Sequence, residues 1–421
     1  MRLNHLRAVY EDYPKQFWLL VGASFIDMVG NALIFPFFAL FMTDRFDVSV
    51  GRVGVIFALF SISGIVGSTI GGALTDRFGR KPIALTSLLV SAAGNLCIGL
   101  ANDFSLMYPL ALMIGLIGSI GHPAWQAMMA DLLPEEKRIE GFGVIRILFN
   151  VAVMFGPIIG GLLAGVSYVL LFSVDAAASL ITASILLVFL RETRPQGQAG
   201  SAPEETLLQT FQGYRRVLRD TRFITFILVG SVVWLVYFQM NTTLAVYLRD
   251  EHGIQPQGFG LLLSMNALMV VALQFWFTRQ IRQRGYPSLL VLAAGTLLYA
   301  IGFSMFGYVS GYALFVMAMI IITIGEMLAV PTGQAVAVQF APEHMRGRYM
   351  AVLGFGFAIA SGSGPWLAGQ VIATLGFEWV WYFAGVIGMM AVIAYLVMYV
   401  RSAPPEAVPS LEEQPTRDLA V

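Results

Sequence analysis

Long apolar segments alternate with short polar segments along the whole chain. Each apolar segment holds about 20 residues or more, which is enough for an α-helix to cross ~30 Å of hydrocarbon. The segments that meet this length are residues 17–42, 51–74, 82–101, 105–130, 142–166, 168–190, 222–248, 256–279, 287–308, 310–335, 347–374 and 378–400. The pattern therefore predicts an all-α membrane protein with twelve transmembrane helices.

Composition supports this fold class and excludes several functions. Of 421 residues, 57% are hydrophobic and 12% are charged, whereas soluble proteins average about 25% charged residues. The 25 basic residues are balanced by 25 acidic ones, so nothing indicates nucleic-acid binding. The single cysteine, Cys97, excludes an internal disulfide and a cysteine metal cluster. We expect no cofactor and no metal.

The positions of lysine and arginine predict the orientation in the membrane. If the N-terminus is cytoplasmic, 22 of the 25 basic residues fall in cytoplasmic segments. The three on the other side are Arg45, Arg52 and Arg249. Cytoplasmic segments carry the excess of positive charge, so we predict a multi-pass protein of the cell membrane with both termini in the cytoplasm.

One long polar gap divides the predicted helices into two sets. We predict a six-helix bundle at residues 1–190, a linker at 191–221, a second six-helix bundle at 222–401 and a disordered tail at 402–421. The linker begins with a flexible stretch. Residues 206–220 carry apolar residues at helical spacing and favour an amphipathic helix on the inner membrane surface. A solvated linker helix fits this pattern equally well.

The two sets are related by an internal repeat. Residues Pro123–Gly161 align without a gap on Pro331–Gly369, an offset of 208 residues. The match includes Gly156-Pro157 on Gly364-Pro365. Six helices separate the copies, so paired helices point the same way. Transporters built from repeats bind their substrates near the midplane between the halves.

A loop motif follows the second predicted helix, in the sequence Gly71-Gly72-Ala73-Leu74-Thr75-Asp76-Arg77-Phe78-Gly79-Arg80-Lys81. We expect Gly72 to permit a close helix contact and Gly79 to permit a tight turn. We expect Asp76 to accept charge-assisted hydrogen bonds from its basic neighbours. The segment resembles the loop signature of the major facilitator superfamily. The residues that carry this cytoplasmic gating motif are Gly72, Asp76, Arg77, Gly79, Arg80 and Lys81.

The resemblance implies a fold and a gate. It implies two pseudo-symmetric six-helix bundles with helices 1, 4, 7 and 10 around a central cavity. It also implies that Asp131, at the end of helix 4, joins a network with Asp76 and Arg80. In the superfamily this network stabilises the outward-open state and breaks when the protein opens inward.

A second motif lies in helix 5. Gly156-Pro157-Ile158-Ile159-Gly160-Gly161 resembles the antiporter signature of the drug:proton antiporters, which helps to seal one conformation against proton leak. A Gly-Pro step also kinks a helix and lets a neighbour pack closely. The copy at Gly364-Pro365 indicates that part of this pattern is architectural.

Ionisable residues inside a membrane are costly and normally have a function or a partner. Asp27 and Glu326 fall near the midplane on two predicted cavity helices, one in each half, and are our candidates for proton coupling. The alternative for each is a structural hydrogen bond. We expect a structural or gating role for Asp175 and snorkelling for Arg146. His122 could relay protons, but a hydrogen-bonding core residue is the simpler interpretation.

A substrate cavity should hold a few polar groups among aromatic ones. Our candidates are Asn31, Trp125, Gln126, Trp234, Tyr237, Gln239 and Asn241.

These observations predict a non-enzymatic secondary transporter that exports lipophilic or cationic small molecules in exchange for protons. We expect it to act as a monomer in the lipid bilayer. The alternatives are symport or facilitated uptake of a small nutrient and, in a different class, a non-transporting membrane sensor.

Overall fold

The computed structural model describes residues 13–194, 214–342 and 345–401. The described chain is helical and carries twelve spans, each a single helix or a run of consecutive helices, that are long and apolar enough to cross a membrane. The prediction of twelve spans is confirmed, with ends that differ by a few residues. The predicted tail and much of the predicted linker helix lie outside the described residues, although residues 214–219 are helical.

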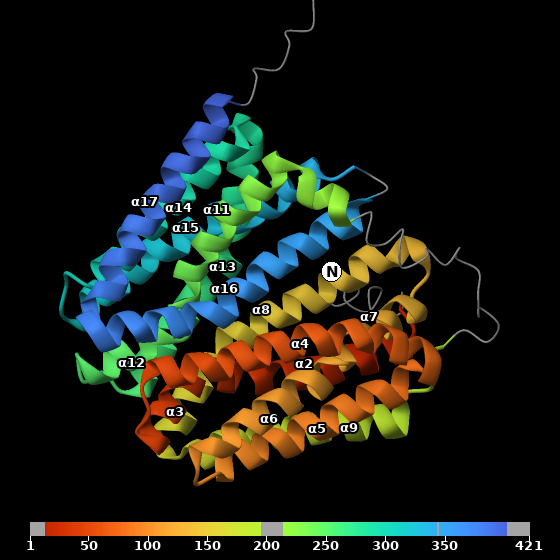
Figure 1. The fold of residues 1–421 in the computed structure, drawn as a ribbon. Helices are drawn as coiled ribbons and strands as arrows, with labels where there is room; N and C mark the ends of the chain where they lie inside the picture. The colour runs from red at the N-terminus through yellow and green to blue at the C-terminus, as the bar shows by residue number, and fades with distance from the viewer. Residues whose placement is uncertain (1–12, 195–213, 343–344, 402–421) are drawn as a thin grey trace, which may run out of the picture.

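The first six spans form one group of helices (Figure 1). Two of its spans are interrupted: a 3₁₀ turn breaks the first, and a π-helical turn breaks the fourth. The elements are α2 (Lys15–Ile34), η1 (Phe35–Phe37), α3 (Phe38–Phe46), α4 (Val50–Phe78), α5 (Arg80–Leu100), η2 (Phe104–Leu106), α6 (Met107–Met113), η3 (Ile114–Gly118), α7 (Gly121–Leu132), α8 (Glu135–Val166) and α9 (Tyr168–Phe189).

The last six spans form a second group with the same plan. Its first span is also interrupted, by a turn at residues 239–242. The elements are α11 (Thr221–Phe238), α12 (Thr243–Asp250), α13 (Pro256–Arg284), α14 (Ser288–Met305), α15 (Tyr312–Phe340), α16 (Arg346–Leu375) and α17 (Glu378–Arg401).

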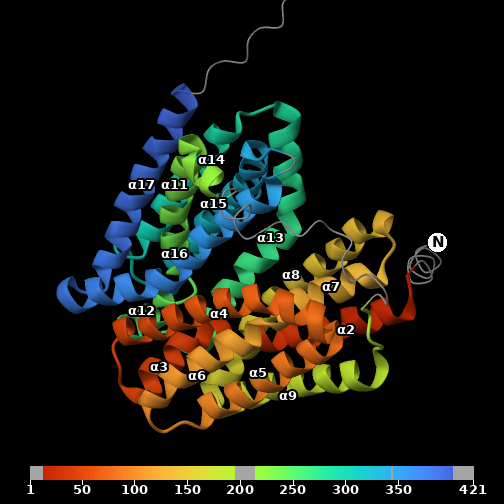
Figure 2. The same cartoon turned by 45° about the vertical axis from the view of Figure 1, so that its right-hand side comes forward.

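The two groups meet at one end and separate toward the other. Figures 1 and 2 show them close together near α3 and α12 and diverging in the opposite direction. We call the closed end, which holds α3 and α12, the far end. We call the other end, where the described chain begins at Tyr13 and finishes at Arg401, the terminal end.

The repeat in the sequence reappears in the packing. The fifth span of each group lies directly on the first span of the same group. In the first group, a Cβ placed at Gly156 of α8 would lie 2.5 Å from Cβ of Ala32 on α2. In the second group, Gly364 of α16 lies against Leu235 and Gln239 at the end of α11. The matched Gly-Pro steps therefore occupy equivalent positions, as a parallel duplication predicts.

Apolar side chains fill the interior of each group and also cover much of its outside. Phe17, Phe37 and Phe172 are fully buried, whereas Phe275 is 78% exposed and Val400 is 81% exposed. A water-soluble protein rarely displays large contiguous apolar patches. In a bilayer this surface faces lipid, which explains why so little of the chain needs to be charged.

Candidate functional site

The far end is closed by two reciprocal helix contacts between the groups. Gly54, on the second span of the first group, lies so close to α16 that a Cβ would overlap the backbone at Pro365 and Trp366. Gly260, on the second span of the second group, lies equally close to the carbonyl of Pro157 on α8. The Gly-Pro step of each group thus receives a glycine from the other group.

Glycine is required at these crossings because backbones touch there. A Cβ at Gly369 would overlap the backbone of Gly51, and a Cβ at Gly161 would lie 2.8 Å from the carbonyl oxygen of Pro256. Gly160 instead faces α2 in its own group, where a Cβ would lie 2.5 Å from the carbonyl oxygen of Leu33. The predicted antiporter segment therefore lies in the closed contact.

Polar contacts at the far end also cross between the groups. Arg249 on α12 donates to the hydroxyl of Thr43, at 3.1 Å, and to the carbonyl of Leu40, at 3.4 Å. Its guanidinium also lies 3.7 Å from the carboxylate of Asp44. Deeper in the contact, the Ser61 hydroxyl lies 3.1 Å from that of Ser361.

Three glycines toward the terminal end make no such close contacts. A Cβ at Gly72 on α4, Gly143 on α8 or Gly354 on α16 would meet no heavy atom within 4 Å. The expected close contact at Gly72 is therefore wrong in this conformation. Its neighbour Gly71 makes one instead, where a Cβ would lie 2.6 Å from the carbonyl oxygen of Ile120.

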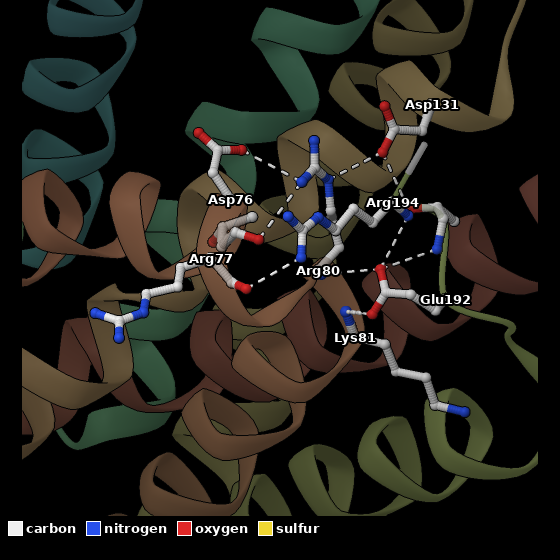
Figure 3. Close-up of polar contacts among 9 residues, drawn as sticks. Asp76, Arg77, Arg80, Lys81, Asp131, Glu192 and Arg194 are labelled. Atoms are coloured by element: carbon white, nitrogen blue, oxygen red, sulfur yellow. Dashed lines mark hydrogen bonds and ion pairs between the residues drawn. The ribbon is translucent and has the colours of Figure 1, made fainter. Parts of the chain in front are cut away.

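The loop motif forms a polar network at the terminal end, entirely within the first group (Figure 3). Arg80 lies 3.3 Å from a carboxylate oxygen of Asp76, and its Nε donates to Asp131 at 3.1 Å. The side chains of Arg80 and Asp131 are only 13% and 17% exposed. The structure therefore brings Asp76, Arg80 and Asp131 together, as predicted from the sequence.

Glu192 is a member of this network that the sequence reasoning missed. Its carboxylate accepts from the backbone N–H groups of Arg80, at 2.9 Å, and Lys81, at 3.1 Å, at the start of α5. It also accepts from the N–H groups of Thr193 and Arg194. Partial burial raises the pKa of Glu192, but these four hydrogen bonds outweigh burial and leave the pKa below its usual range.

Glycine at position 79 makes this contact possible. Gly79 has a φ of +100°, and a Cβ there would lie 2.6 Å from a carboxylate oxygen of Glu192. The tight turn expected at Gly79 is thus observed. Two further bonds fasten the loop, because Lys81 Nζ donates to the carbonyl of Leu190 and Arg194 donates to that of Arg77.

The resemblance makes a further prediction about the network of Asp76, Arg80 and Asp131, which stays a prediction. The resemblance predicts that it breaks when the terminal end opens. Here the groups have separated at the terminal end, yet the contacts from Arg80 to Asp76 and Asp131 are intact. The reason is topological: all three residues belong to the first group, so separation of the groups does not pull them apart.

Glu326 lies at the centre of a hydrogen-bonded cluster inside the second group. Its two carboxylate oxygens accept from the hydroxyl of Tyr237, at 3.0 Å, and the amide of Asn266, at 2.9 Å. Asn266 also donates to Thr323 at 2.9 Å. This cluster joins α11, α13 and α15 through one carboxyl group. Of the sequence candidates, Tyr237 is directly beside the proposed coupling acid.

Asp27 lies between α2 and α9 in the first group. It accepts from the hydroxyl of Ser179 at 2.9 Å and from the amide of Asn31 at 3.3 Å. The imidazole of His122 on α7 is near enough to interact electrostatically with this carboxylate. The candidate residues Asp27 and Asn31 therefore lie together.

An aromatic cavity of about 210 Å³ lies between the groups, below the far-end contact. Its walls combine four phenylalanines with three hydroxyl side chains. The lining residues are Phe35, Phe57, Phe60, Phe238, Ser61, Thr242 and Ser361. None of them was a sequence candidate, because phenylalanine in an apolar segment is indistinguishable from core or lipid-facing residues.

The remaining cavity candidates lie in three places. Trp234 lies beside Tyr237, with ring centroids 5.3 Å apart, and so belongs to the Glu326 side. Trp125 packs against the core of the first group, and Gln126 beside it is exposed. Gln239 and Asn241 lie in the turn between α11 and α12. The side chain of Gln239 donates to the carbonyl of Leu235 and accepts from the hydroxyl of Thr243, so it stabilises this turn.

Comparison with known proteins identifies the class. The sequence profile of the Major Facilitator Superfamily matches residues 20–355 and 240–421. The chain belongs to this superfamily, and it is therefore a secondary transporter and not an enzyme.

Individual relatives are more distant. The chain is 28% identical over 407 residues to the "Na(+), Li(+), K(+)/H(+) antiporter" of Planococcus maritimus, covering 90% of this chain and 94% of that protein. It is 24% identical over 390 residues to "Multidrug resistance protein MdtH" of Shigella sonnei, covering 90% and 92%.

Solved structures show the same fold. A POT family transporter in complex with 5-aminolevulinic acid matches with a TM-score of 0.75 at 18% identity, over 91% of this chain and 96% of that one. The nucleoside transporter NupG matches with a TM-score of 0.77 at 14% identity, over 92% of this chain and 99% of that one.

Proposed function

We propose that this chain exports lipophilic or cationic small molecules from the cytoplasm in exchange for protons, by alternating access. The observation that carries the proposal is the Glu326 cluster. A carboxyl group inside a membrane protein is a functional candidate by default. Here it is held by Tyr237 and Asn266, both of them neutral donors.

Neutral donors leave the charge of Glu326 uncompensated. A cationic substrate or a proton could each supply the missing positive charge. Competition between the two at one carboxyl group would couple export to proton entry. Asp27 offers a second such carboxyl in the other group, held by Ser179 and Asn31 and close to His122.

The aromatic cavity supports a lipophilic substrate. Phe35, Phe57, Phe60 and Phe238 provide apolar and π surface, which suits planar or cationic organic molecules. The polar groups that line it are three hydroxyls and no charged side chain, so shape and lipophilicity would dominate selection. A small hydrophilic nutrient would find few partners there, which favours export of lipophilic compounds over nutrient uptake.

We further propose that the terminal end is the cytoplasmic end. The excess of basic residues in the sequence falls in the segments at this end, in agreement with the rule that positive charge stays inside. With this orientation the structure is open to the cytoplasm and closed to the outside. The two termini then lie in the cytoplasm, and Arg249 contributes to the outer closure.

A second candidate is exchange of monovalent metal cations for protons. The named activity of the Planococcus relative favours it, since that protein matches nearly the full length of this chain. The acids Asp27 and Glu326 would then alternate between a metal cation and a proton.

Transport by purified protein in liposomes, under an imposed pH gradient, tests these proposals. We expect a lipophilic cation dye to move against the proton flow, and Asp27→Asn and Glu326→Gln to weaken the dependence on the gradient. Asp103→Asn is the matched control because Asp103 lies outside the membrane spans. Dye movement that ignores the gradient would refute antiport. Proton exchange with Na⁺, Li⁺ or K⁺, without dye movement, would favour the second candidate.

A further inference from the structure

The first group contains an acid that the proposed coupling scheme does not use. Asp175 on α9 has no exposed surface. Its Oδ2 accepts from the amide of Asn95 on α5 at 2.6 Å. Its Oδ1 is buried and has no hydrogen-bond partner among the described residues. A buried carboxylate without a compensating charge is strongly disfavoured, so this oxygen needs a positive partner or a proton.

Asp175 lies one helical turn from Asp27 across a tight helix pair. Three contacts fix the register of α2 against α9. Thr182 donates to the carbonyl of Ala23, and Ser179 donates to Asp27. A Cβ at Gly30 would lie 2.7 Å from Oδ1 of Asp175.

Gly30 therefore leaves room for the oxygen that lacks a partner. Asp175 and Ser179 are four residues apart on α9, where side chains are neighbours on one helix face, and Ser179 in turn donates to Asp27.

The helices packed against α9 are α2, α5 and α8, and the basic residue inside α8, Arg146, is exposed. From α2 the facing titratable group is Asp27, and from α5 the facing group is the neutral Asn95. The cations of α5, Arg80 and Lys81, lie about 20 Å from Asn95 along the helix. Two carboxylates this close, in a dry interface, are not both ionised.

The neighbours of Asp175 differ in how far they are buried. His122 on α7 is exposed, Asp27 is partly buried, and Asp175 is fully buried. Burial therefore increases from His122 through Asp27 to Asp175.

We propose that Asp175 is a second proton site, which exchanges one proton with Asp27. The proton passes by way of the Ser179 hydroxyl, which donates to Asp27. As the O–H bond on one carboxyl breaks, Ser179 accepts that proton and passes its own to the other carboxyl, so the pair keeps a single negative charge. Asp175 would hold the proton while Asp27 is engaged with a substrate or with His122. The role in transport rests on the proposed proton coupling, but the existence of the shared proton does not.

Infrared difference spectroscopy of the purified full-length protein, titrated with pH, tests the pair directly. The C=O stretching band of a protonated carboxylic acid reports each acid without substrate or gradient. We expect Asp175→Asn to remove such a band and to shift the titration midpoint of Asp27 by about one pH unit or more. Asp27→Asn should shift the midpoint of Asp175 by a similar amount, because coupling is reciprocal.

Glu326→Gln is the matched control. It should remove its own band and leave the titration of the Asp27–Asp175 pair unchanged. If Asp175→Asn fails to fold, Gly30→Ala provides a second test, because its Cβ presses on Oδ1 of Asp175. It should displace that carboxyl and shift the midpoint of Asp27.

An unchanged Asp27 midpoint in the folded variant overturns the proposal. A failed dye assay with a positive infrared result would instead refute the proposed function alone.

Discussion

The two ends of the contact between the helix groups are built in different ways. At the far end the groups touch through glycines and backbone, and Arg249 adds polar contacts that cross from one group to the other. At the terminal end the polar network of Arg80 is confined to the first group. One set of contacts therefore joins the two groups, whereas the other lies within a single group, so we expect only the first set to change when the groups move.

The largest expected effect comes from filling the far-end crossing. Gly54→Leu places a side chain where the backbone at Trp366 lies. Overpacking of this kind costs about 1–3 kcal/mol, so the far-end-closed state should lose population roughly fivefold to a hundredfold. Distances between spin labels at the far end, together with dye transport, measure the change. Gly260→Leu should act alike, because it lies at the reciprocal crossing.

Gly72→Leu is the control on the same helix, since a Cβ at this position meets nothing within 4 Å. It should leave the far end closed. Equal opening of the far end by Gly72→Leu and Gly54→Leu would contradict the difference between the two ends.

The second effect should appear as stability and not as a change of conformation. Arg80→Ala leaves Asp131, which is 17% exposed, without its cationic partner. Losing a hydrogen bond to a charged group costs about 1–3 kcal/mol, so we expect the melting temperature to fall by a few degrees. Far-end distances should stay unchanged. Arg77→Ala is the control, because Arg77 is exposed. A shift of the conformational equilibrium by Arg80→Ala would show that the network also acts between the groups.

A smaller effect is expected from the crossing arginine. Arg249→Ala removes contacts to Leu40, Thr43 and Asp44 of the other group. Partly exposed ion pairs contribute about 0.5–1 kcal/mol, so the far-end-closed state should lose population about two- to fivefold, and less at high salt. Arg45→Ala is matched, because Arg45 bonds Asn102 within its own group. Identical behaviour of the two variants would rule out Arg249 as a crossing contact.

The smallest effect is a dependence of stability on pH. Since hydrogen bonding holds the pKa of Glu192 below its usual range, the ionised group stabilises the fold above about pH 4.3. This stabilisation is lost as the pH falls through the lowered pKa. Glu192 is exposed, so the contribution should stay under about 1 kcal/mol. Melting of Glu192→Gln against the wild type should show a difference at neutral pH that vanishes in acid. A difference that grows in acid would refute the assignment.

The sequence predicted the membrane spans well, because the hydropathy of a segment directly indicates whether lipid or water surrounds it. It also brought Asp76, Arg80 and Asp131 together correctly, through the motif they carry. Glu192 was not predicted as a member of this network, because a charged residue in a polar stretch gives no local sign that it will accept hydrogen bonds from the start of a distant helix. We predicted a continuous helix through Gln239 and Asn241, because nothing in an apolar segment indicates the turn that interrupts the helix.

The aromatic cavity illustrates a further limit. Phe57 and Phe238 lie far apart in the sequence and come together only when the two groups close at the far end. No local pattern distinguishes a phenylalanine that lines such a space from one that faces lipid. Only the relative placement of the groups makes that distinction.

The interruptions in the first span of each group have a mechanical consequence. Beyond the 3₁₀ turn and the turn at residues 239–242, only α3 and α12 remain, with 9 and 8 residues. Each is a short helix of about 12–14 Å that is connected by a turn to the longer helix before it. We expect α3 and α12 to move while the longer helices stay in place, so that the far end can open without a rotation of either whole group.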